Sequence, residues 1–271
     1  MTAVALRDVI EPSRFGGKAV ELGAAIRAGL PVPEGVALAV ELVAEVVGGS
    51  PRARSVVSGL HATLGGSVAV RSSAVGEDSA TASFAGQHAT ILNVASESGL
   101  VEAVCAVHAS GHADAALAYR ARAGVPGAPR IAVVVQRLVH AHAAGVLFTR
   151  DPVTGRDERV IESAWGLGEI VVAGLVNPDR YRIDRTGKIV ERTIGCKDVM
   201  IVPRPGGGTE EISVADDRAR TGLTDAQLAE LDQLAARCEA AFGPAGHDIE
   251  WAFGDDGRVH LLQRRPITRK L

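Results

Sequence analysis

The sequence contains few aromatic residues and no excess of basic charge. Of its 271 residues, 3% are aromatic while 46% are hydrophobic, so the core must consist mainly of aliphatic side chains. The scarcity of aromatic rings argues against the stacking platforms that bind single-stranded nucleic acids. The formal net charge of −3 and the absence of a basic block argue against an electrostatic nucleic-acid interface. We therefore expect no nucleic-acid partner.

Cysteine is also rare, and long apolar segments are missing. The three cysteines, Cys105, Cys196 and Cys238, are widely spaced and form no CxxC pair, which is typical of a reducing compartment. The N-terminus has no basic-then-apolar signal segment, and no apolar run is long enough to span a bilayer. The sequence thus predicts a cytoplasmic globular protein with no membrane partner.

Hydrophobic periodicity divides the chain into a helix-rich first half and a strand-rich second half. In the first half, the run SVAVRSS predicts a strand over 67–73. A Gly- and Pro-rich break at 124–129 predicts a lobe boundary, with an N-terminal lobe of residues 1–126 and a C-terminal lobe of residues 127–271. Helices are expected over residues 15–30, 38–47, 55–64 and 96–123.

The second half is expected to form a sheet with one long helix, which makes the fold class α+β. The amphipathic helix over 223–243 has Thr224 as its N-cap and Gln227 in the capping-box position. Alternating apolar residues on both sides of the turn GDDG predict a closing β-hairpin over 247–268. Other strands are predicted over residues 131–139, 144–149, 159–164, 179–184 and 188–194.

Lys18 is the first residue that could carry chemistry. It follows Gly16 and Gly17 at a predicted helix start, where backbone N–H groups, the helix dipole and the ammonium group would favour a phosphate. The motif GGK is not a Walker A motif, and a solvated lysine at a turn is the structural alternative.

Arg71 ends a predicted buried strand and precedes a loop rich in Ser, Gly, Ala and Thr, within VAVRSSAVGEDSATASFAG at 68–86. A loop of this composition is suited to covering phosphates, and an arginine can hold phosphate oxygens in a bidentate fork. A plain mobile surface loop is the alternative.

Gln136 lies in the apolar run VVVQRLV over 133–139. A glutamine in such a strand is often a core amide with satisfied hydrogen bonds, and this stretch alone favours that interpretation. The functional alternative is an adenine pocket, in which backbone groups near Arg137 and Leu138 contact the base and Gln136 faces the ligand.

The closing hairpin places an acid and a Gln-x-Arg pair on neighbouring strands. Glu250 and Gln263 supply oxygen atoms, which Mg²⁺ prefers while it leaves its remaining positions to water and phosphate. Arg265 would then neutralise phosphate oxygens beside the metal. A cross-strand salt bridge between Glu250 and Arg265 is the structural alternative.

The histidines give little support to a different chemistry. His108 and His112 have the i, i+4 spacing of helical metal ligands, but Gly111 interrupts that helix and no third ligand is close in sequence. His140 and His142 follow an apolar strand and are interpreted as turn residues.

Taken in order, these stretches resemble one protein family. The motifs GGK…GLPVPEG, VAVRSSAVGED…SFAGQ, VVVQRLV…AGVLFTRDPVTG, ESAWGLGEIVVAGLVNPDRY and HDIEWAF…LLQRRPIT cover roughly residues 14 to 268. They resemble the nucleotide-binding domain of phosphoenolpyruvate synthase, which pyruvate phosphate dikinase and the rifampin phosphotransferases share. The resemblance implies an ATP-grasp-type fold whose two lobes close on ATP and Mg²⁺.

The resemblance also implies roles for the matching positions. Three basic residues would contact phosphates and offset charge on the transferred phosphoryl group, which makes them the expected catalytic residues. Three other residues would contact the nucleotide, and two would lie near Mg²⁺ and the ribose or phosphate of the nucleotide. In that order the residues are Lys18, Arg71 and Arg265; Gly86, Thr90 and Gln136; and Glu250 and Gln263.

Members of this family move a phosphoryl group in relays. ATP is split to AMP, and its β-phosphoryl passes to a histidine on a separate swivelling domain before delivery to pyruvate, rifampin or another small acceptor. The present sequence stops just after RPIT and shows no Gly-rich histidine motif of that domain. The resemblance therefore implies a swivelling phosphohistidine domain and an acceptor-binding domain that lie on another chain or are missing from this one.

Two other classes of function stay open at this point. A non-catalytic module would sense ATP and regulate a partner, but it would not need to retain both the metal and the phosphate groups. A stand-alone ligase or kinase would need its own acceptor pocket, which no motif indicates.

Overall fold

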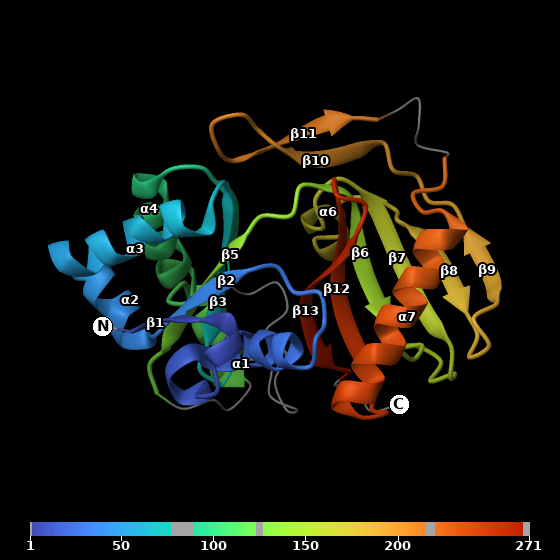
Figure 1. The fold of residues 1–271 in the computed structure, drawn as a ribbon, viewed down its shortest axis with the longest axis horizontal. Coiled ribbons are helices and arrows are strands. Elements are labelled where there is room, and N and C mark those ends of the chain that lie inside the picture. Colours follow the sequence, from blue (N-terminus) through green and yellow to red (C-terminus); the bar gives the residue numbers. More distant parts are fainter. Residues whose placement is uncertain (1, 77–88, 123–126, 215–219, 268–271) are drawn as a thin grey trace. The chain divides into compact units, whose positions relative to one another are not determined.

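A computed structural model describes residues 2–76, 89–122, 127–214 and 220–267 of the chain (Figure 1). The chain forms two compact units, and each unit combines helices with a β-sheet, so the predicted α+β class is confirmed. Unit 1 consists of Met1–Arg27, Pro33–Leu138 and Arg204–Thr209, and unit 2 consists of Ala28–Val32, Val139–Pro203 and Glu210–Leu271.

The sheet of unit 1 has five strands in the order β1-β2-β5-β3-β4, and all its neighbouring strands are antiparallel. Its central strands are rich in valine, which fits a strand covered on both faces. The strands are β1 (Ala3–Ala5), β2 (Gly35–Leu38), β3 (Val68–Ala74), β4 (Thr90–Val94) and β5 (Ile131–Arg137).

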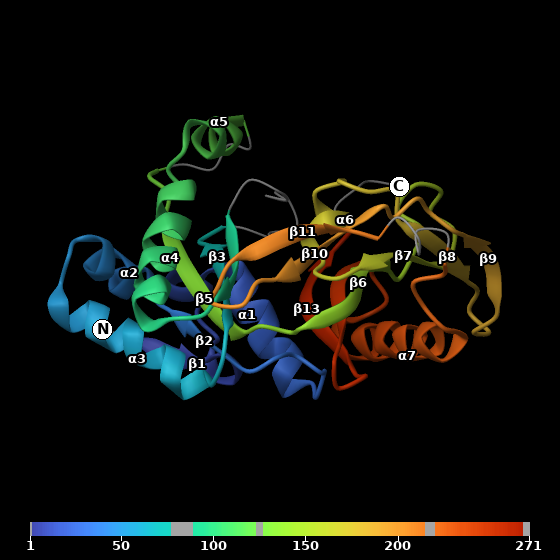
Figure 2. The ribbon, with the colours of Figure 1, turned by 90° about the horizontal axis from the view of Figure 1, so that it is seen from above.

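Helices cover both faces of this sheet. On one face, α2 (Val40–Val47), α3 (Pro51–Leu64) and α4 (Glu97–Ser110) form an aliphatic core with Val68 and Val70 of β3 (Figures 1 and 2). Because side chains alternate along a strand, Arg71 and Ser73 of β3 belong to the other face.

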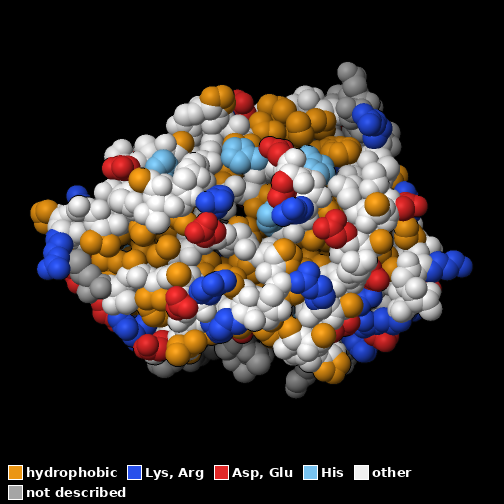
Figure 3. Space-filling view, viewed as in Figure 1, with side chains coloured by type: hydrophobic (Ala, Val, Ile, Leu, Met, Phe, Trp, Pro, Cys, Tyr) orange, Lys and Arg blue, Asp and Glu red, His pale blue; other side chains and the backbone are white. Residues whose placement is uncertain are grey.

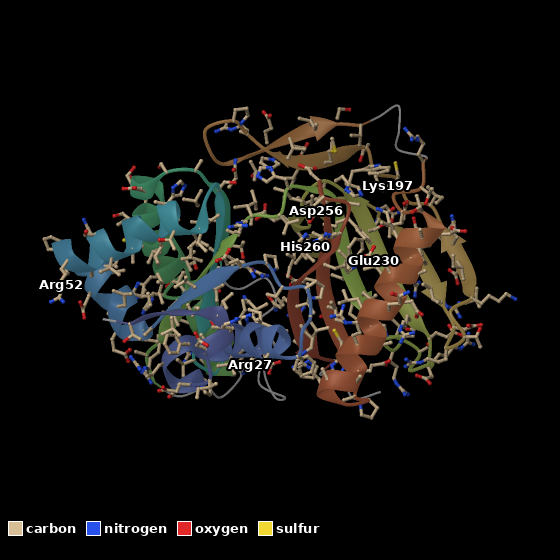
Figure 4. All side chains as sticks on the ribbon, viewed as in Figure 1. Arg27, Arg52, Lys197, Glu230, Asp256 and His260 are labelled. Atoms are coloured by element: carbon tan, nitrogen blue, oxygen red, sulfur yellow. The ribbon has the colours of Figure 1, made fainter. Side chains whose placement is uncertain are left out.

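Helix α1 (Pro12–Arg27) lies on that second face, and Gly16 of α1 meets the backbone of Ser73. The far end of α1 is held by Arg27 (Figure 4), whose guanidinium donates to the carbonyls of Arg7 (2.6 Å) and Val9 (3.1 Å). Unit 1 also contains a 3-10 helix, Leu6–Asp8, and α5 (Asp114–Arg122).

The sheet of unit 2 has six antiparallel strands in the order β13-β12-β6-β7-β8-β9. Helix α7 (Asp225–Phe242) lies along one face of this sheet (Figures 1 and 2). The other elements are β6 (Ala141–Phe148), β7 (Arg159–Trp165), β8 (Asp179–Ile183), β9 (Ile189–Thr193), β12 (His247–Gly254), β13 (Val259–Pro266) and α6 (Glu169–Val172).

Two predicted features of unit 2 are confirmed. The capping box at the start of α7 is complete, because the Thr224 hydroxyl accepts from the Gln227 N–H and the Gln227 side chain accepts from the Thr224 N–H. β12 and β13 pair as a hairpin. Its turn carries Asp256, whose carboxylate lies 3.4 Å from the ring of His260, and Glu230 of α7 accepts a hydrogen bond from the backbone of β13 (Figure 4).

A second hairpin, β10 (Val199–Pro203) and β11 (Thr209–Ser213), was not predicted as strands. Its turn, Arg204–Thr209, groups with unit 1. There the buried Asn93 donates its side-chain amide to the carbonyls of Arg204 (2.8 Å) and Gly208 (2.6 Å). Asn93 has a φ of 55°, and the residue lies where the β3–β4 pairing shifts register, so a bulge positions these bonds.

Other boundaries differ from those predicted by periodicity. The segment predicted as a helix over 38–47 begins only at Val40, because residues 35–38 pair as β2 between β1 and β5. The helix predicted over 96–123 divides into α4 and α5 around Gly111. The lobe boundary predicted after residue 126 stays a prediction. In the structure, β5 follows residue 126 in sequence but belongs to unit 1.

Candidate functional site

Three of the predicted site residues lie on one face of the unit 1 sheet. Arg71 of β3 is directly opposite Thr90 of β4, and Gln136 of β5 is opposite Ala69, two residues before Arg71. Paired residues of antiparallel strands share a face. Arg71 and Gln136 are buried residues, at 8% and 2% exposure.

Lys18 is carried onto the same face by α1. The helix is interrupted at Gly16 (φ 74°, ψ 171°), so Lys18 stands in the first turn after the interruption. Its residue is buried, with 7% exposure, so the solvated-lysine alternative does not describe it. The interruption lies against Ser73 of β3, which is two residues from Arg71 and shares its face.

Gln136 has the hydrogen bond that a buried amide requires. Its Nε2 donates to the Pro33 carbonyl at 2.9 Å. The adjacent backbone N–H groups of Arg137 and Leu138 donate to the carbonyls of Glu34 (2.8 Å) and Ser67 (3.0 Å). Gln136 is therefore a buried amide with a hydrogen-bond partner, its role toward a nucleotide stays a prediction, and any adenine contact near this strand end would use groups other than these N–H donors.

The predicted residues of unit 2 share one face of the β12–β13 hairpin. Glu250 is directly opposite Gln263, and Asp248 is directly opposite Arg265. Glu250 and Asp248 are two residues apart, so their side chains leave β12 on the same side. Helix α7 covers the opposite face, which carries the buried residues Ile249 and His247.

Asp248 was missed by the sequence reasoning and completes this polar face. Its Oδ2 accepts from Nε of Arg265 at 2.8 Å, so Arg265 forms an ion pair with Asp248. The signal was present in the sequence, because Asp248 precedes Glu250 by two residues and therefore shares its face of the strand.

The electrostatic environment of Asp248 is unusual for a carboxyl group. Burial raises its pKa above the ordinary value, and the neighbouring Glu250 raises the pKa further, while Arg265 opposes the shift. Its second oxygen, Oδ1, is buried and has no hydrogen-bond partner within the described residues. An oxygen of this kind is suited to a cation or to a polar ligand atom.

The reverse face of the hairpin carries a separate cluster. Nδ1 of His247 lies 3.1 Å from the guanidinium of Arg264, and Nε2 lies 2.9 Å from the Gly243 carbonyl. Since a carbonyl only accepts, Nε2 carries the proton and Nδ1 accepts from Arg264. The Arg264 guanidinium also stacks over Phe242 of α7 at 4.0 Å from the ring centroid. The neighbouring residues Arg264 and Arg265 therefore lie on opposite faces of the hairpin. Arg264 contacts a histidine and an aromatic ring, whereas Arg265 contacts a carboxylate.

The remaining candidates are Gly86 and the histidine pair His108 and His112. Gly86 lies outside the described residues. His112 donates Nδ1–H to the His108 carbonyl at 3.0 Å, and their rings lie 4.4 Å apart. Within residues 2–76, 89–122, 127–214 and 220–267, no group of three or more His, Cys, Asp or Glu side chains is arranged to hold a metal.

The surface agrees with the balanced charge of the sequence. Basic and acidic side chains are interspersed on the face shown in Figure 3. None of the helices in the described parts of the chain is both long enough and apolar enough to cross a membrane.

Comparison with known protein families shows to which family the chain belongs. A model of the family described as pyruvate phosphate dikinase, AMP/ATP-binding domain, matches residues 52–271. This chain belongs to that family. The match includes β3 with Arg71 and the hairpin with Glu250, and it confirms the resemblance inferred from the motifs. Lys18 precedes the matched segment of this dikinase-family chain.

Curated relatives extend the assignment and are much longer. Rifampicin phosphotransferase from Streptomyces sviceus is 45% identical over 203 residues, covering 74% of this chain and 23% of that protein. Phosphoenolpyruvate synthase from Pyrococcus furiosus is 41% identical over 212 residues, covering 74% and 26%. The prodigiosin synthesizing transferase PigC from Serratia marcescens is 38% identical over 288 aligned residues, covering 96% and 32%. The dikinase-family chain thus spans at most about a third of these relatives.

Proposed function

We propose that this chain is the ATP- and Mg²⁺-binding component of a dikinase-type phosphotransferase. It would split ATP to AMP and pass the β-phosphoryl to a histidine on a separate swivelling domain, for transfer to a small acceptor such as pyruvate or an antibiotic. The observation that carries the proposal is the polar face of the β12–β13 hairpin in a chain of this family.

The residues on this face suit a magnesium nucleotide. Mg²⁺ commonly takes one or two carboxylates and completes its shell with water and phosphate oxygens. Glu250 and Gln263 are opposite each other, and Oδ1 of Asp248, which has no hydrogen-bond partner in the part of the chain that the structure describes, supplies a further oxygen on the same face. These groups would hold the ion, and the bound ion would offset phosphate charge.

Arg265 would contact phosphate oxygens from the same hairpin. Its Nε is used by Asp248, which fixes the plane of the guanidinium. A fixed guanidinium can present its terminal N–H groups to an anion without further ordering. Asp248 would therefore orient Arg265 as well as contribute an oxygen.

Lys18 and Arg71 of unit 1 would contact phosphates as well. Both are buried basic residues associated with one sheet face, where Thr90 would lie against the nucleotide. Gln136 would lie near the adenine and sugar. Gly86, which is not among the described residues, would also contact the nucleotide. Within this set, no residue is proposed to form a covalent bond with the phosphoryl group.

Catalysis would consequently be electrostatic. When the acceptor histidine attacks the β-phosphorus, the bond from that phosphorus to the oxygen bridging to the α-phosphate breaks, AMP leaves, and the histidine carries the joined β- and γ-phosphates. Attack of water on the γ-phosphorus would then break the β–γ link and release inorganic phosphate, so that the β-phosphoryl remains on the histidine. Lys18, Arg71 and Arg265 would stabilise the charge that spreads over the phosphoryl oxygens. We expect Arg71→Ala to lower partner-dependent turnover by at least about a hundredfold while it changes folding stability far less.

The first test is calorimetric titration of ATP with and without Mg²⁺, on wild type and on Glu250→Ala. We expect Mg²⁺-dependent binding in wild type and its loss in the variant. Asp255→Ala is the matched control, because Asp255 lies in the exposed turn of the same hairpin and should leave binding unchanged.

Product analysis then separates the classes of function. AMP formation with a histidine-domain protein of the family supports the relay. ADP formation would indicate a stand-alone kinase or ligase instead, and ATP binding without turnover would indicate a sensor. No binding by wild type would overturn the proposal.

A further inference from the structure

Ser73 makes two buried hydrogen bonds on either side of Lys18. Its Oγ donates to the Phe15 carbonyl at 2.7 Å and accepts from the Ala19 N–H at 3.0 Å. The residue is fully buried, and it lies 54 to 58 positions away from its partners in sequence. One hydroxyl thus connects the two ends of the segment Gly16–Gly17–Lys18 to β3.

This geometry replaces a missing helix cap. After the interruption at Gly16, α1 starts again, and the first N–H groups of any helix lack partners within it. A Ser, Thr, Asp or Asn at the N-cap normally accepts from the second or third helical N–H, but Gly16 has no side chain. Ser73 accepts from Ala19, the third residue after Gly16, and so supplies the capping oxygen from another strand.

The glycine is required for the cap to approach. A Cβ on residue 16 would lie 2.0 Å from the Ser73 carbonyl oxygen and 2.6 Å from its Oγ. The positive φ of Gly16 also belongs to the region that favours glycine. The sequence Gly16-Gly17-Lys18 therefore allows the helix start to lie directly on the strand that carries Arg71.

We propose that Ser73 is a positioning residue, which fixes the helix start bearing Lys18 relative to Arg71 so that both basic groups meet the same phosphates. Ser73 and Arg71 are two residues apart on one face of β3. The hydrogen bonds of Ser73 to the helix start therefore fix the position of that helix start relative to Arg71. This inference rests on the proposed function, because it assigns the purpose of the cap to phosphate binding.

Ser72 provides a matched control in the same strand. It is equally buried, at 1% exposure, but it lies on the opposite face, and its Oγ has no hydrogen-bond partner within the described residues. Ser72→Ala removes a hydroxyl without removing a hydrogen bond, so it should leave ATP affinity unchanged and should not destabilise the fold.

The experiment is a double-mutant cycle on ATP binding. Calorimetry with Mg²⁺-ATP compares wild type, Ser73→Ala, Lys18→Ala and the double variant, with adenosine as a second ligand. We expect Ser73→Ala to weaken ATP binding about tenfold, which corresponds to about 1.4 kcal/mol. Adenosine binding should not change, and Ser73→Ala should have no further effect once Lys18 is absent.

Each outcome separates this inference from the proposed function. If wild type binds ATP but Ser73→Ala binds equally well, or if the two substitutions add independently, Ser73 does not act through Lys18 and only the inference fails. If wild type does not bind ATP, the proposed function fails and the inference with it.

A second pair of variants covers the case in which Ser73→Ala does not fold. Ser73→Thr keeps the hydroxyl and should bind ATP like wild type. Ser73→Cys keeps a group of similar size whose sulfur is a weak acceptor, and it should bind ATP more weakly. Equal affinity of the two variants would overturn the positioning role.

Discussion

The polar residues of unit 1 and those of unit 2 are held in place by different forces. In unit 1, hydrogen bonds between neutral groups hold the residues in place. The Ser73 hydroxyl bonds to the backbone on both sides of Lys18, and the Gln136 amide donates to the Pro33 carbonyl. In unit 2, Arg265 is fixed by an ion pair with a carboxyl group whose pKa is raised by burial. The first arrangement depends on backbone conformation, and the second depends on charge.

This difference indicates which changes each arrangement tolerates. Neutral bonds between buried groups do not respond to pH near neutrality, but they fail when the backbone is displaced by an ångström. A partly buried ion pair tolerates small displacements better, but removal of one partner leaves the other charge without compensation. Unit 1 should therefore be most sensitive to substitutions that displace the backbone, and unit 2 to substitutions that remove a charge.

The largest effect is expected from Gly16→Ala in unit 1. The new Cβ would lie 2.0 Å from a backbone oxygen of Ser73, and the φ of 74° is unfavourable for alanine. We expect a loss of at least about 3 kcal/mol in the free energy of unfolding, measured by urea denaturation.

Gly59→Ala is the control for this prediction. Gly59 is exposed in the middle of α3, and nothing lies within 4 Å of a Cβ built there. Alanine should stabilise that helix by about 0.5–1 kcal/mol. Similar effects of the two substitutions would show that Gly16 is not a site of close backbone approach.

A smaller effect is expected from Arg265→Ala in unit 2. The substitution leaves the Asp248 carboxylate partly buried without its partner, and we expect a loss of about 2 kcal/mol in unfolding free energy. Adding Asp248→Asn should recover part of this loss. An additive double variant would contradict the coupling, and Arg258→Ala in the exposed turn should stay within about 0.5 kcal/mol of wild type.

The smallest effect is a difference in pH dependence. Because the folded pKa of Asp248 is raised, the folded state holds this proton more tightly than the unfolded chain does. Its contribution to stability is therefore greatest below the unfolded pKa, about 4, and declines as the pH rises through the folded pKa. Asp248→Asn should remove that decline when unfolding free energies are compared between about pH 4 and 7.

Asp184 gives the opposite sign in the same unit. Hydrogen bonds from Thr186 lower its pKa, so its contribution is present above the unfolded pKa and is lost as the pH falls through the folded pKa. Asp184→Asn should therefore flatten the acid side of the profile. Identical pH dependence of the two variants would contradict the assignment for Asp248.

The hairpin could be predicted from sequence because its signals are local. Alternation predicts that Glu250 shares a face with Asp248 and that Gln263 shares one with Arg265. The pairing of Glu250 with Gln263 and of Asp248 with Arg265 depends in addition on a register shift between Glu250 and Trp251, which the turn does not predict. What the sequence did not reveal is the burial of Asp248, which depends on the packing around the hairpin. The raised pKa follows from that burial.

The role of Ser73 could not be predicted, since its partners are more than 50 residues away in sequence. The positive φ of Gly16 accompanies its close approach to β3. The sequence places the Gly-Gly-Lys turn at the start of the helix, whereas α1 already begins at Pro12 and is interrupted at Gly16. Short strands such as β1 and β4 were missed because their identity comes from pairing with distant strands. A hydrogen bond of the Gln136 amide could be expected, because a buried amide requires a partner, but the Pro33 carbonyl that accepts it lies 103 residues away in sequence.

The turn of the β10–β11 hairpin has a consequence for attempts to divide the protein. The chain passes between the two units after residues 27, 32, 138, 203 and 209, so neither unit is one continuous segment. A cut after residue 138 would separate Asn93 from the two carbonyls that accept its amide hydrogens. Fragments made there should behave as complementing halves that need each other to fold, and separate expression of either unit would require the chain to be rewired.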